Sequence, residues 1–219
     1  MKLIVDKQQL RITEIFYSLQ GETRTVGLPT VFVRLTGCPL RCQYCDTAYA
    51  FSGGQMLTLD DICSKVASYK PKYVTVTGGE PLAQKACIDL LKLLCDQGYN
   101  VSLETSGAID VSLVDSRVVK VLDLKTPASG ESSRNLWSNL EFIQTHDQIK
   151  FVICDRDDYE WAKNILFDYN LNHKCEILFS PSYQQLALAD LADWILVDRL
   201  EVRMQIQLHK HIWGDVAGK

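Results

Sequence analysis

The sequence lacks two kinds of run that would indicate a membrane or a nucleic acid as the partner. Its N-terminal segment meets charge at Asp6 and Lys7 after a short apolar stretch, too short for a signal peptide or a membrane span. The 23 basic residues form no sustained run, and with 27 acidic residues the formal net charge is −4. We therefore expect a soluble, cytoplasmic protein that binds neither a membrane nor nucleic acid.

Linkers, repeats and low-complexity segments are also missing. The 6 prolines and 12 glycines are scattered, and no repeat of about 20–50 residues is visible. The 4 tryptophans are too dispersed to form a platform on which bases could stack. A chain of 219 residues with 47% hydrophobic content can bury one sizeable core, so we predict a single domain spanning residues 1–219.

Cysteine, in contrast, is plentiful. Three of the 8 cysteines, Cys38, Cys42 and Cys45, fall within eight residues, which fits thiolate ligands in a reducing compartment better than a disulfide framework. We expect the others to pack as small hydrophobic side chains, namely Cys63, Cys87, Cys95, Cys154 and Cys175.

Strand and helix patterns alternate along the chain. Strands are predicted at 30–35, 73–77, 101–104, 118–124, 149–154, 176–179 and 202–208. Helices are predicted from Thr58 as N-cap, from Pro81 to Gly98, and at 138–146, 157–169 and 186–195. This order predicts an α/β fold of parallel βαβ units, with an open or a closed barrel-like sheet. The loops after the strands should meet on one face and carry the chemistry.

The first predicted strand leads directly into the CxxxCxxC spacing of Cys38, Cys42 and Cys45. An iron–sulfur cluster is usually held by four cysteine thiolates. Three close cysteines therefore indicate a [4Fe-4S] cluster in which one iron has no protein ligand. No histidine or cysteine follows at the spacing of a structural zinc site.

This pattern resembles the radical S-adenosylmethionine (SAM) superfamily, in which an aromatic residue such as Tyr44 precedes the last cysteine. The segment from Gly78 to Pro81 is similar to the GGE motif of that superfamily. The resemblance implies that SAM chelates the open iron and that one electron from the cluster yields a 5′-deoxyadenosyl radical. The cofactor then supplies the difficult chemistry, while the protein supplies orientation and a dry pocket.

Matches spread over almost the whole chain resemble the 7-carboxy-7-deazaguanine synthases: residues 16–22, 32–38, 45–47, 77–81, 104–107 and 207–210. The resemblance implies a lyase with an incomplete, modified (β/α)6 TIM-like barrel of the radical SAM type. That lyase would convert 6-carboxy-5,6,7,8-tetrahydropterin to 7-carboxy-7-deazaguanine with loss of ammonia, on the route to queuosine. It also implies Mg2+, a homodimer, and an electron donor such as flavodoxin or ferredoxin.

The resemblance also assigns site residues. Thr47 would bind Mg2+, and the substrate would contact Leu19, Gln20, Gly21, Arg34 and Thr77. A guanidinium fork at Arg34 matches a substrate carboxylate, and Mg2+ prefers oxygen ligands. SAM would contact Tyr44, Cys45, Asp46, Gly79, Glu80, Glu104, Ser106, Asp123, Leu124, Lys125 and Ser180. Many relatives carry Ser-Pro-Lys where this chain has Asp123, Leu124 and Lys125, so that part of the assignment rests mainly on the lysine.

Two alternatives remain open. An activating enzyme that forms a glycyl radical on a large partner protein would share the cysteine loop, although the matches at Leu19–Glu22 and Cys45–Thr47 are against it. A non-catalytic iron–sulfur carrier or a structural metal module would normally add a fourth protein ligand.

Overall fold

The structure, a computed structural model, describes residues 8–214, 216 and 218. A nine-stranded sheet with the order β3-β1-β2-β4-β5-β6-β7-β8-β9 runs through it. The strands are β1 (Gln9–Leu19), β2 (Pro29–Leu35), β3 (Gln55–Thr58), β4 (Tyr73–Gly78), β5 (Asn100–Thr105), β6 (Val119–Leu124), β7 (Gln148–Ile153), β8 (Glu176–Pro181) and β9 (Arg203–Met204). The α-helices are α1 (Leu59–Ser68), α2 (Cys87–Asp96), α3 (Arg156–Asp168), α4 (Leu188–Asp198) and α5 (Leu208–Trp213).

The parallel part of the sheet consists of β2, β4, β5, β6, β7, β8 and β9. β1 pairs antiparallel with β2, and β3 pairs antiparallel with β1. Among the described residues the two end strands, β3 and β9, do not pair with each other, so the sheet is an open barrel. The predicted α/β class and the incomplete, modified (β/α)6 barrel are confirmed.

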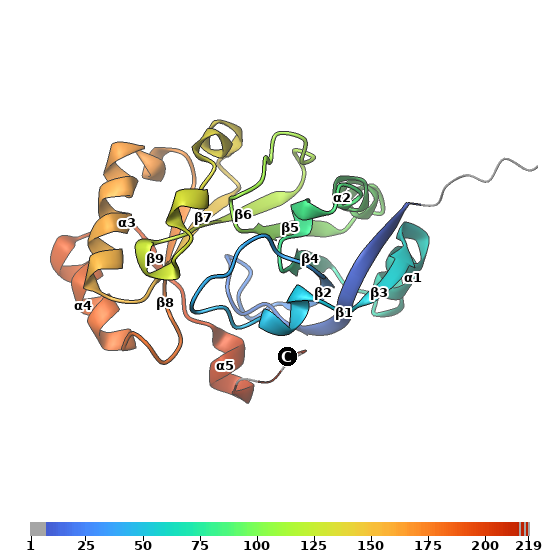
Figure 1. The fold of residues 1–219 in the computed structure, drawn as a ribbon, viewed down its shortest axis with the longest axis horizontal. Helices are drawn as coiled ribbons and strands as arrows, with labels where there is room; N and C mark the ends of the chain where they lie inside the picture. The colour runs from blue at the N-terminus through green and yellow to red at the C-terminus, as the bar shows by residue number, and fades with distance from the viewer. Residues whose placement is uncertain (1–7, 215, 217, 219) are drawn as a thin grey trace, which may run out of the picture.

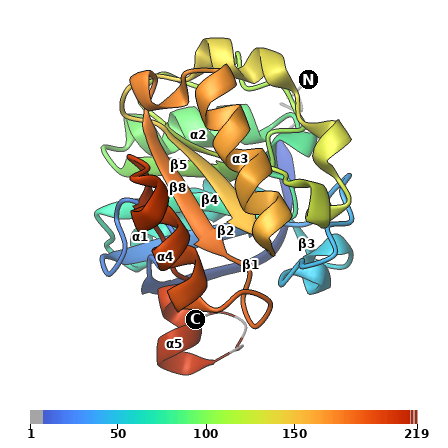
Figure 2. The same cartoon turned by 90° about the vertical axis from the view of Figure 1, so that its left-hand side faces the viewer.

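The helices α1 to α4 lie on the outer side of the sheet, and α5 lies apart from them near the C-terminus (Figure 1). Figure 2 shows α3 and α4 side by side in front of the strands, and the Tyr159 hydroxyl of α3 donates to the Trp194 carbonyl of α4 at 2.9 Å. Alternating strand residues and the inward helix faces form one apolar core, which includes Val33, Val76 and Leu103 at 0% exposure.

Helix α1 begins as predicted. The Thr58 hydroxyl accepts a hydrogen bond from the Asp61 amide at 3.1 Å, which satisfies one of the free N–H groups of the first turn. Leu59, Ile62 and Val66 then bury one face of the helix. The predicted helix from Pro81 is divided: a 3-10 turn, η2 (Pro81–Ala83), precedes α2.

Four other expectations need correction. The strand at 30–35 is not the first, because β1 precedes it, and a bulge between Ile12 and Glu14 breaks the alternation that would have revealed β1. β3 was also missed. The helix at 138–146 is instead a 3-10 segment, η5 (Trp137–Phe142). The buried Asn139 amide holds that segment by donating to the carbonyls of Gly107 and Ile109.

The strand predicted at 202–208 is also wrong, because β9 has only two residues and α5 begins at Leu208. The buried Gln205 amide donates to the Gly21 carbonyl at 3.2 Å, which turns the chain away from the sheet. The remaining 3-10 segments are η1 (Ala48–Phe51), η3 (Pro127–Ser129), η4 (Ser132–Arg134) and η6 (Leu171–His173), and no α-helix lies between β5 and β7 in the described chain. Within the residues that can be described, no helix is long and apolar enough to cross a bilayer.

Residues 20–28, here called the crossing loop, connect β1 to β2 by passing over the inner face of the sheet. The Gln20 amide donates to the Thr75 hydroxyl of β4, and the Arg24 guanidinium pairs with Glu176 of β8 at 3.0 Å. The Arg24 backbone N–H donates to the Gln148 side chain of β7. The loop therefore contacts β4 and the first residues of β7 and β8.

Candidate active site

A cavity of about 610 Å³ opens where the parallel strands end. A volume of this size lies within the range of small-molecule and cofactor sites. The cysteine loop follows β2, the Gly78–Glu80 loop follows β4, and the Thr105–Gly107 loop follows β5. The predicted convergence of these loops on one face is confirmed.

All three cysteines of the loop are free and half-buried. Cys42 and Cys45 line the cavity, whereas Cys38 does not, and its Sγ accepts a hydrogen bond from the Leu40 backbone N–H at 3.4 Å. Burial raises the pKa of the Cys42 thiol to about 11, with the Lys125 charge opposing that rise. Three thiols on one short loop are the donor set that an iron–sulfur cluster needs, and none of the other five cysteines lines the cavity.

The glycines after β4 allow that loop to approach the cysteine loop. A Cβ atom on Gly79 would lie 2.2 Å from the Gly37 carbonyl oxygen and 2.8 Å from the Cys38 Cβ. Gly78 has φ +150, and a Cβ there would lie 2.3 Å from the Leu35 carbonyl oxygen. Only glycine fits such close backbone approaches, so these two positions fix the cysteine loop against β4.

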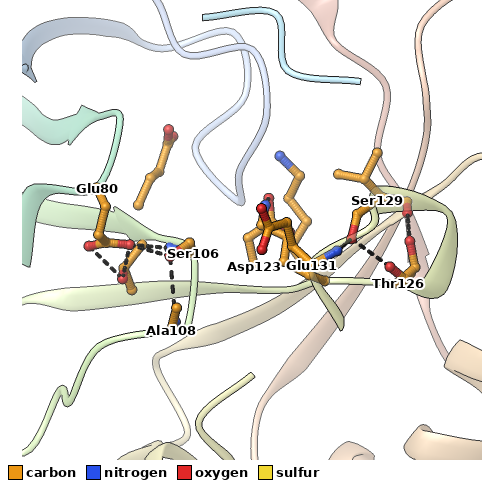
Figure 3. Close-up of polar contacts among 12 residues, drawn as sticks. Glu80, Ser106, Ala108, Asp123, Thr126, Ser129 and Glu131 are labelled. Carbon is orange, nitrogen blue, oxygen red and sulfur yellow. Dashed lines mark hydrogen bonds and ion pairs between the residues drawn. The ribbon is translucent and has the colours of Figure 1, made fainter. Parts of the chain in front are cut away.

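Glu80 is fully buried, and its carboxylate connects two loops (Figure 3). It accepts hydrogen bonds from the Leu82 and Ser106 amides at 2.9 and 2.7 Å. It also accepts from the hydroxyls of Thr105 and Ser106. These donors occupy both carboxylate oxygens, so Glu80 binds the next loop rather than reaching the cavity, which it does not line.

A second acidic group does face the cavity. Asp123 Oδ2 pairs with Lys125 Nζ at 3.0 Å, while Asp123 Oδ1 and the Tyr44 hydroxyl are buried and have no hydrogen-bond partner among the described residues. Burial raises the pKa of Tyr44, with the Asp123 charge adding to the effect. Buried polar atoms without a partner are rare, so this pair fits a polar ligand that would satisfy them.

Two partly buried carboxylates, Glu22 and Glu104, also line the cavity. Glu104 of β5 accepts from the Thr77 hydroxyl at 2.9 Å and from the Gln20 amide at 3.2 Å. Glu22 of the crossing loop pairs with Lys150 of β7 at 2.6 Å. Burial raises the pKa of Glu104, as does the charge of Glu22.

Arg34 of β2 lines the same part of the cavity. Its Nε donates to Glu14 Oε1 at 2.7 Å, and its guanidinium lies over the rings of Phe16 and Tyr49. Burial alone would lower the pKa of Arg34, but the neighbouring Tyr49 and Glu14 outweigh burial and raise it. The guanidinium is thus a permanent, oriented positive charge.

The segment at α5 closes one side of the cavity. The Gln207 amide donates to Glu22 Oε1 at 3.0 Å and to Asp46 Oδ2 at 2.9 Å, and Lys210 Nζ lies 3.0 Å from the same Asp46 oxygen. Ligand atoms of Glu22, Asp46 and His209 lie within 4.8 Å of one another, a spacing that could suit a metal. Because Gln207, Lys210 and Lys150 already provide donors there, this group is a charge network within the protein.

Most of the predicted contact residues line the cavity. They are Leu19, Gln20, Gly21, Arg34, Cys42, Tyr44, Cys45, Asp46, Thr47, Thr77, Gly79, Glu104, Ser106, Asp123, Lys125 and Ser180. Cys38, Glu80 and Leu124 do not line it. Leu124 is fully buried in the apolar core.

Several cavity residues had no role assigned from the sequence, and the charged and hydrogen-bonding ones among them include Glu22, Lys150, Gln207 and Lys210. Glu22, Gln207 and Lys210 lie in the segments 16–22 and 207–210 that resemble the 7-carboxy-7-deazaguanine synthases, and this resemblance could have pointed to them. Lys150 has no such signal, because it lies in the middle of a strand pattern and only the crossing loop gives it a partner.

Comparison with known proteins agrees with this geometry. Residues 32–122 match the Radical SAM superfamily. The crystal structure of QueE from Escherichia coli superposes with a TM-score of 0.76 over 91% of this chain and 94% of that one, at 23% identity, which shows a shared fold. The fold and the cysteine-bearing cavity are those of a radical SAM enzyme.

Two curated relatives define the family more narrowly. A 7-carboxy-7-deazaguanine synthase from Chlorobaculum tepidum is 44% identical over 95% of this chain and 96% of its own length. One from Koribacter versatilis is 42% identical over 93% of this chain and 97% of its own length. The chain belongs to the 7-carboxy-7-deazaguanine synthase family, and neither a glycyl-radical activating enzyme nor an electron carrier is supported.

Proposed function

We propose that the enzyme converts 6-carboxy-5,6,7,8-tetrahydropterin to 7-carboxy-7-deazaguanine with loss of ammonia, a step toward queuosine. The observation that carries this proposal is one cavity that is lined both by the free cysteines Cys42 and Cys45 and by Arg34, Glu104 and Glu22. The names of the relatives support the product. Substrate and product differ by one ammonia, so the reaction needs no net oxidant or reductant, and SAM can be regenerated.

The residues at the mouth fit the cofactors. Cys38, Cys42 and Cys45 would hold the [4Fe-4S] cluster, which together with SAM supplies the one-electron chemistry. The unpartnered Asp123 Oδ1 would accept from SAM, and the Tyr44 hydroxyl offers a donor. In this proposal Glu80 acts on SAM indirectly, by fixing the loop that carries Ser106.

The deeper residues fit the pterin. Arg34 would bind the substrate carboxylate, with Glu14 and Tyr49 restricting its orientation. Glu104 would accept from the donor edge of the ring, while Thr77 and Gln20 hold it in place. The crossing loop covers the inner face of the sheet, which would exclude water during the reaction.

We place Mg2+ at Thr47. The Thr47 hydroxyl donates to Asp46 Oδ1 at 2.8 Å, so the lone pairs of its oxygen remain available to a hard cation. The side chain lines the cavity beside the cysteine loop, so it would hold the cation there, and the cation would supply a Lewis acid for oxygen atoms of the substrate.

Other parts of the proposal rest on the family resemblance. They are a homodimer, reduction by flavodoxin or ferredoxin, a cytoplasmic location, and one domain over residues 1–219.

The test is anaerobic incubation of the iron-reconstituted enzyme with dithionite, SAM, Mg2+ and 6-carboxytetrahydropterin, followed by mass spectrometry. We expect 7-carboxy-7-deazaguanine from the wild type and from Cys87→Ala, whose buried thiol lies outside the cavity. We expect none from Cys42→Ala. Formation of 5′-deoxyadenosine without product would refute the proposed substrate, and product from Cys42→Ala would refute the assigned cluster ligands.

A further inference from the structure

Lys150 is a largely buried lysine that lines the cavity and has no role in the chemistry described so far. Its side chain is 11% exposed, and its Nζ lies 2.6 Å from Glu22 Oε2. In the sheet it is the register partner of Asp123 on β6, so it lies at the boundary between the SAM end and the pterin end of the cavity.

Other cations of the cavity have acidic partners of their own. Lys125 pairs with Asp123, Lys210 with Asp46, and Arg34 with Glu14. Each of these three cations is therefore paired with an acidic residue other than Glu22 and Glu104.

Glu22 and Glu104 depend on Lys150 in a different way. The hydrogen-bond donors to Glu104 are the neutral side chains of Thr77 and Gln20. The side-chain oxygen of Gln20 accepts from the Glu22 backbone N–H at 2.9 Å. Gln20 therefore holds Glu22 and Glu104 near each other. Two buried carboxylates close together cannot both remain ionised unless a positive charge offsets them.

We propose, on the basis of the function proposed above, that Lys150 is a positioning residue that keeps Glu22 and Glu104 together as acceptors for the amino and ring N–H edge of the pterin. A pair of carboxylates matches that edge because its groups are all donors. This arrangement would select a pterin or guanine-like ring over rings that present acceptors there.

The electrostatics agree with this role. Burial alone would raise the pKa of Glu22, but the charge of Lys150 outweighs burial and lowers it. Burial and Glu22 raise the pKa of Glu104, and Lys150 opposes them. Burial alone would lower the pKa of Lys150, but Glu22, Asp123 and Glu104 raise it, so the ammonium keeps its proton and is not itself an acid catalyst.

Other titratable groups also face this pair. Asp46 and His209 lie near Glu22 from the cysteine loop and from α5, and the His209 Nε2 is 3.8 Å from Glu22 Oε1. Arg34 faces Glu104 from β2. These groups are unchanged in the variants of Lys150 and Lys120, so a shift between those curves is assigned to the substituted lysine.

The experiment measures binding of the fluorescent probe pterin-6-carboxylate to the reconstituted enzyme as a function of pH. Removing the positive charge in Lys150→Met should raise the pKa of the carboxylates, and therefore shift the acid limb of binding upward by about 1–3 pH units. At the pH of the wild-type acid midpoint the dissociation constant should rise about fivefold or more, whereas Lys150→Arg should keep the wild-type curve. The control is Lys120→Met, which breaks a buried 2.9 Å pair with Asp147 outside the cavity. It should lower stability and leave the acid limb in place.

A Lys150→Met curve that overlays the wild type would overturn the inference. If Lys150→Met does not fold, Glu104→Gln decides, because removal of one like charge should shift the acid limb downward, and an unmoved limb is then the refuting result. No binding of the probe to the wild type would instead refute the proposed substrate class, so the two failures can be told apart.

Discussion

Replacement of Glu80 by glutamine should destabilise the protein even though this side chain does not line the cavity. An amide has one oxygen, so the donors that face its NH2 group lose their acceptor. The hydroxyls of Thr105 and Ser106 can rotate to other acceptors, but the amide N–H of Leu82 or Ser106 cannot. A buried donor left without a partner costs about 1–3 kcal/mol, and the lost charge-assisted bonds add to this.

We therefore expect Glu80→Gln to lower the free energy of unfolding by about 2–4 kcal/mol, a large part of the roughly 5–15 kcal/mol of a typical domain. Urea denaturation of the metal-free protein, followed by tryptophan fluorescence, measures this value directly. Glu141→Gln, at an exposed position, is the matched control. A loss for Glu80→Gln no greater than about 0.5 kcal/mol would refute the assigned network.

Three further predictions concern the loops around the cavity. Gly79→Ala should reduce the iron content after reconstitution, because its Cβ would collide with the Gly37 carbonyl; wild-type iron content would contradict the close packing. Thr47→Ala should raise the Mg2+ concentration needed for half-maximal activity while leaving SAM binding intact, and an unchanged Mg2+ titration would refute the metal site. Burial alone would raise the pKa of Asp46, but the charge of Lys210 and the hydrogen bonds that Asp46 accepts outweigh burial and lower this pKa. Because the Asp46 side chain is 34% exposed, its stabilisation is about 1 kcal/mol, fully present above an unfolded pKa of about 4 and lost as the pH falls from there through the lowered pKa of the folded state. The difference in unfolding free energy between wild type and Asp46→Asn should therefore be full at pH 7 and shrink steadily as the pH is lowered from about 4 to about 2, whereas a constant difference over this range would contradict this.

The parallel strands were predictable because each is a short apolar run that ends at a glycine or a polar loop. The run before Cys38 and the run before Gly78 became β2 and β4 with almost the predicted bounds. β1 was not predictable in the same way, since Arg11 and Glu14 interrupt its pattern and the bulge shifts its register. Local propensity also could not show that Asn139 bonds to the loop after β5, which prevents an α-helix there.

In the site, too, features that are local in the sequence were predictable and contacts between distant segments were not. Motif spacing identified the cysteines and the residues beside them, which are close together in the chain. Contacts between distant segments were hidden, such as Glu22 with Lys150, 128 positions apart, and Gln207 with Asp46, 161 positions apart. Glu80 is a third case: its motif predicted a SAM contact but could not show that its carboxylate accepts hydrogen bonds from Thr105 and Ser106, 25 and 26 positions further along the chain.

The most direct test of the account is the number of 7-carboxy-7-deazaguanine molecules formed for each SAM consumed by the reduced, Mg2+-loaded enzyme. In this account SAM lies beside the pterin in one cavity, and the reaction removes only ammonia, so SAM can be regenerated after each turnover. The prediction is therefore many product molecules per SAM. At most one product per SAM, with an equal amount of 5′-deoxyadenosine, would contradict it.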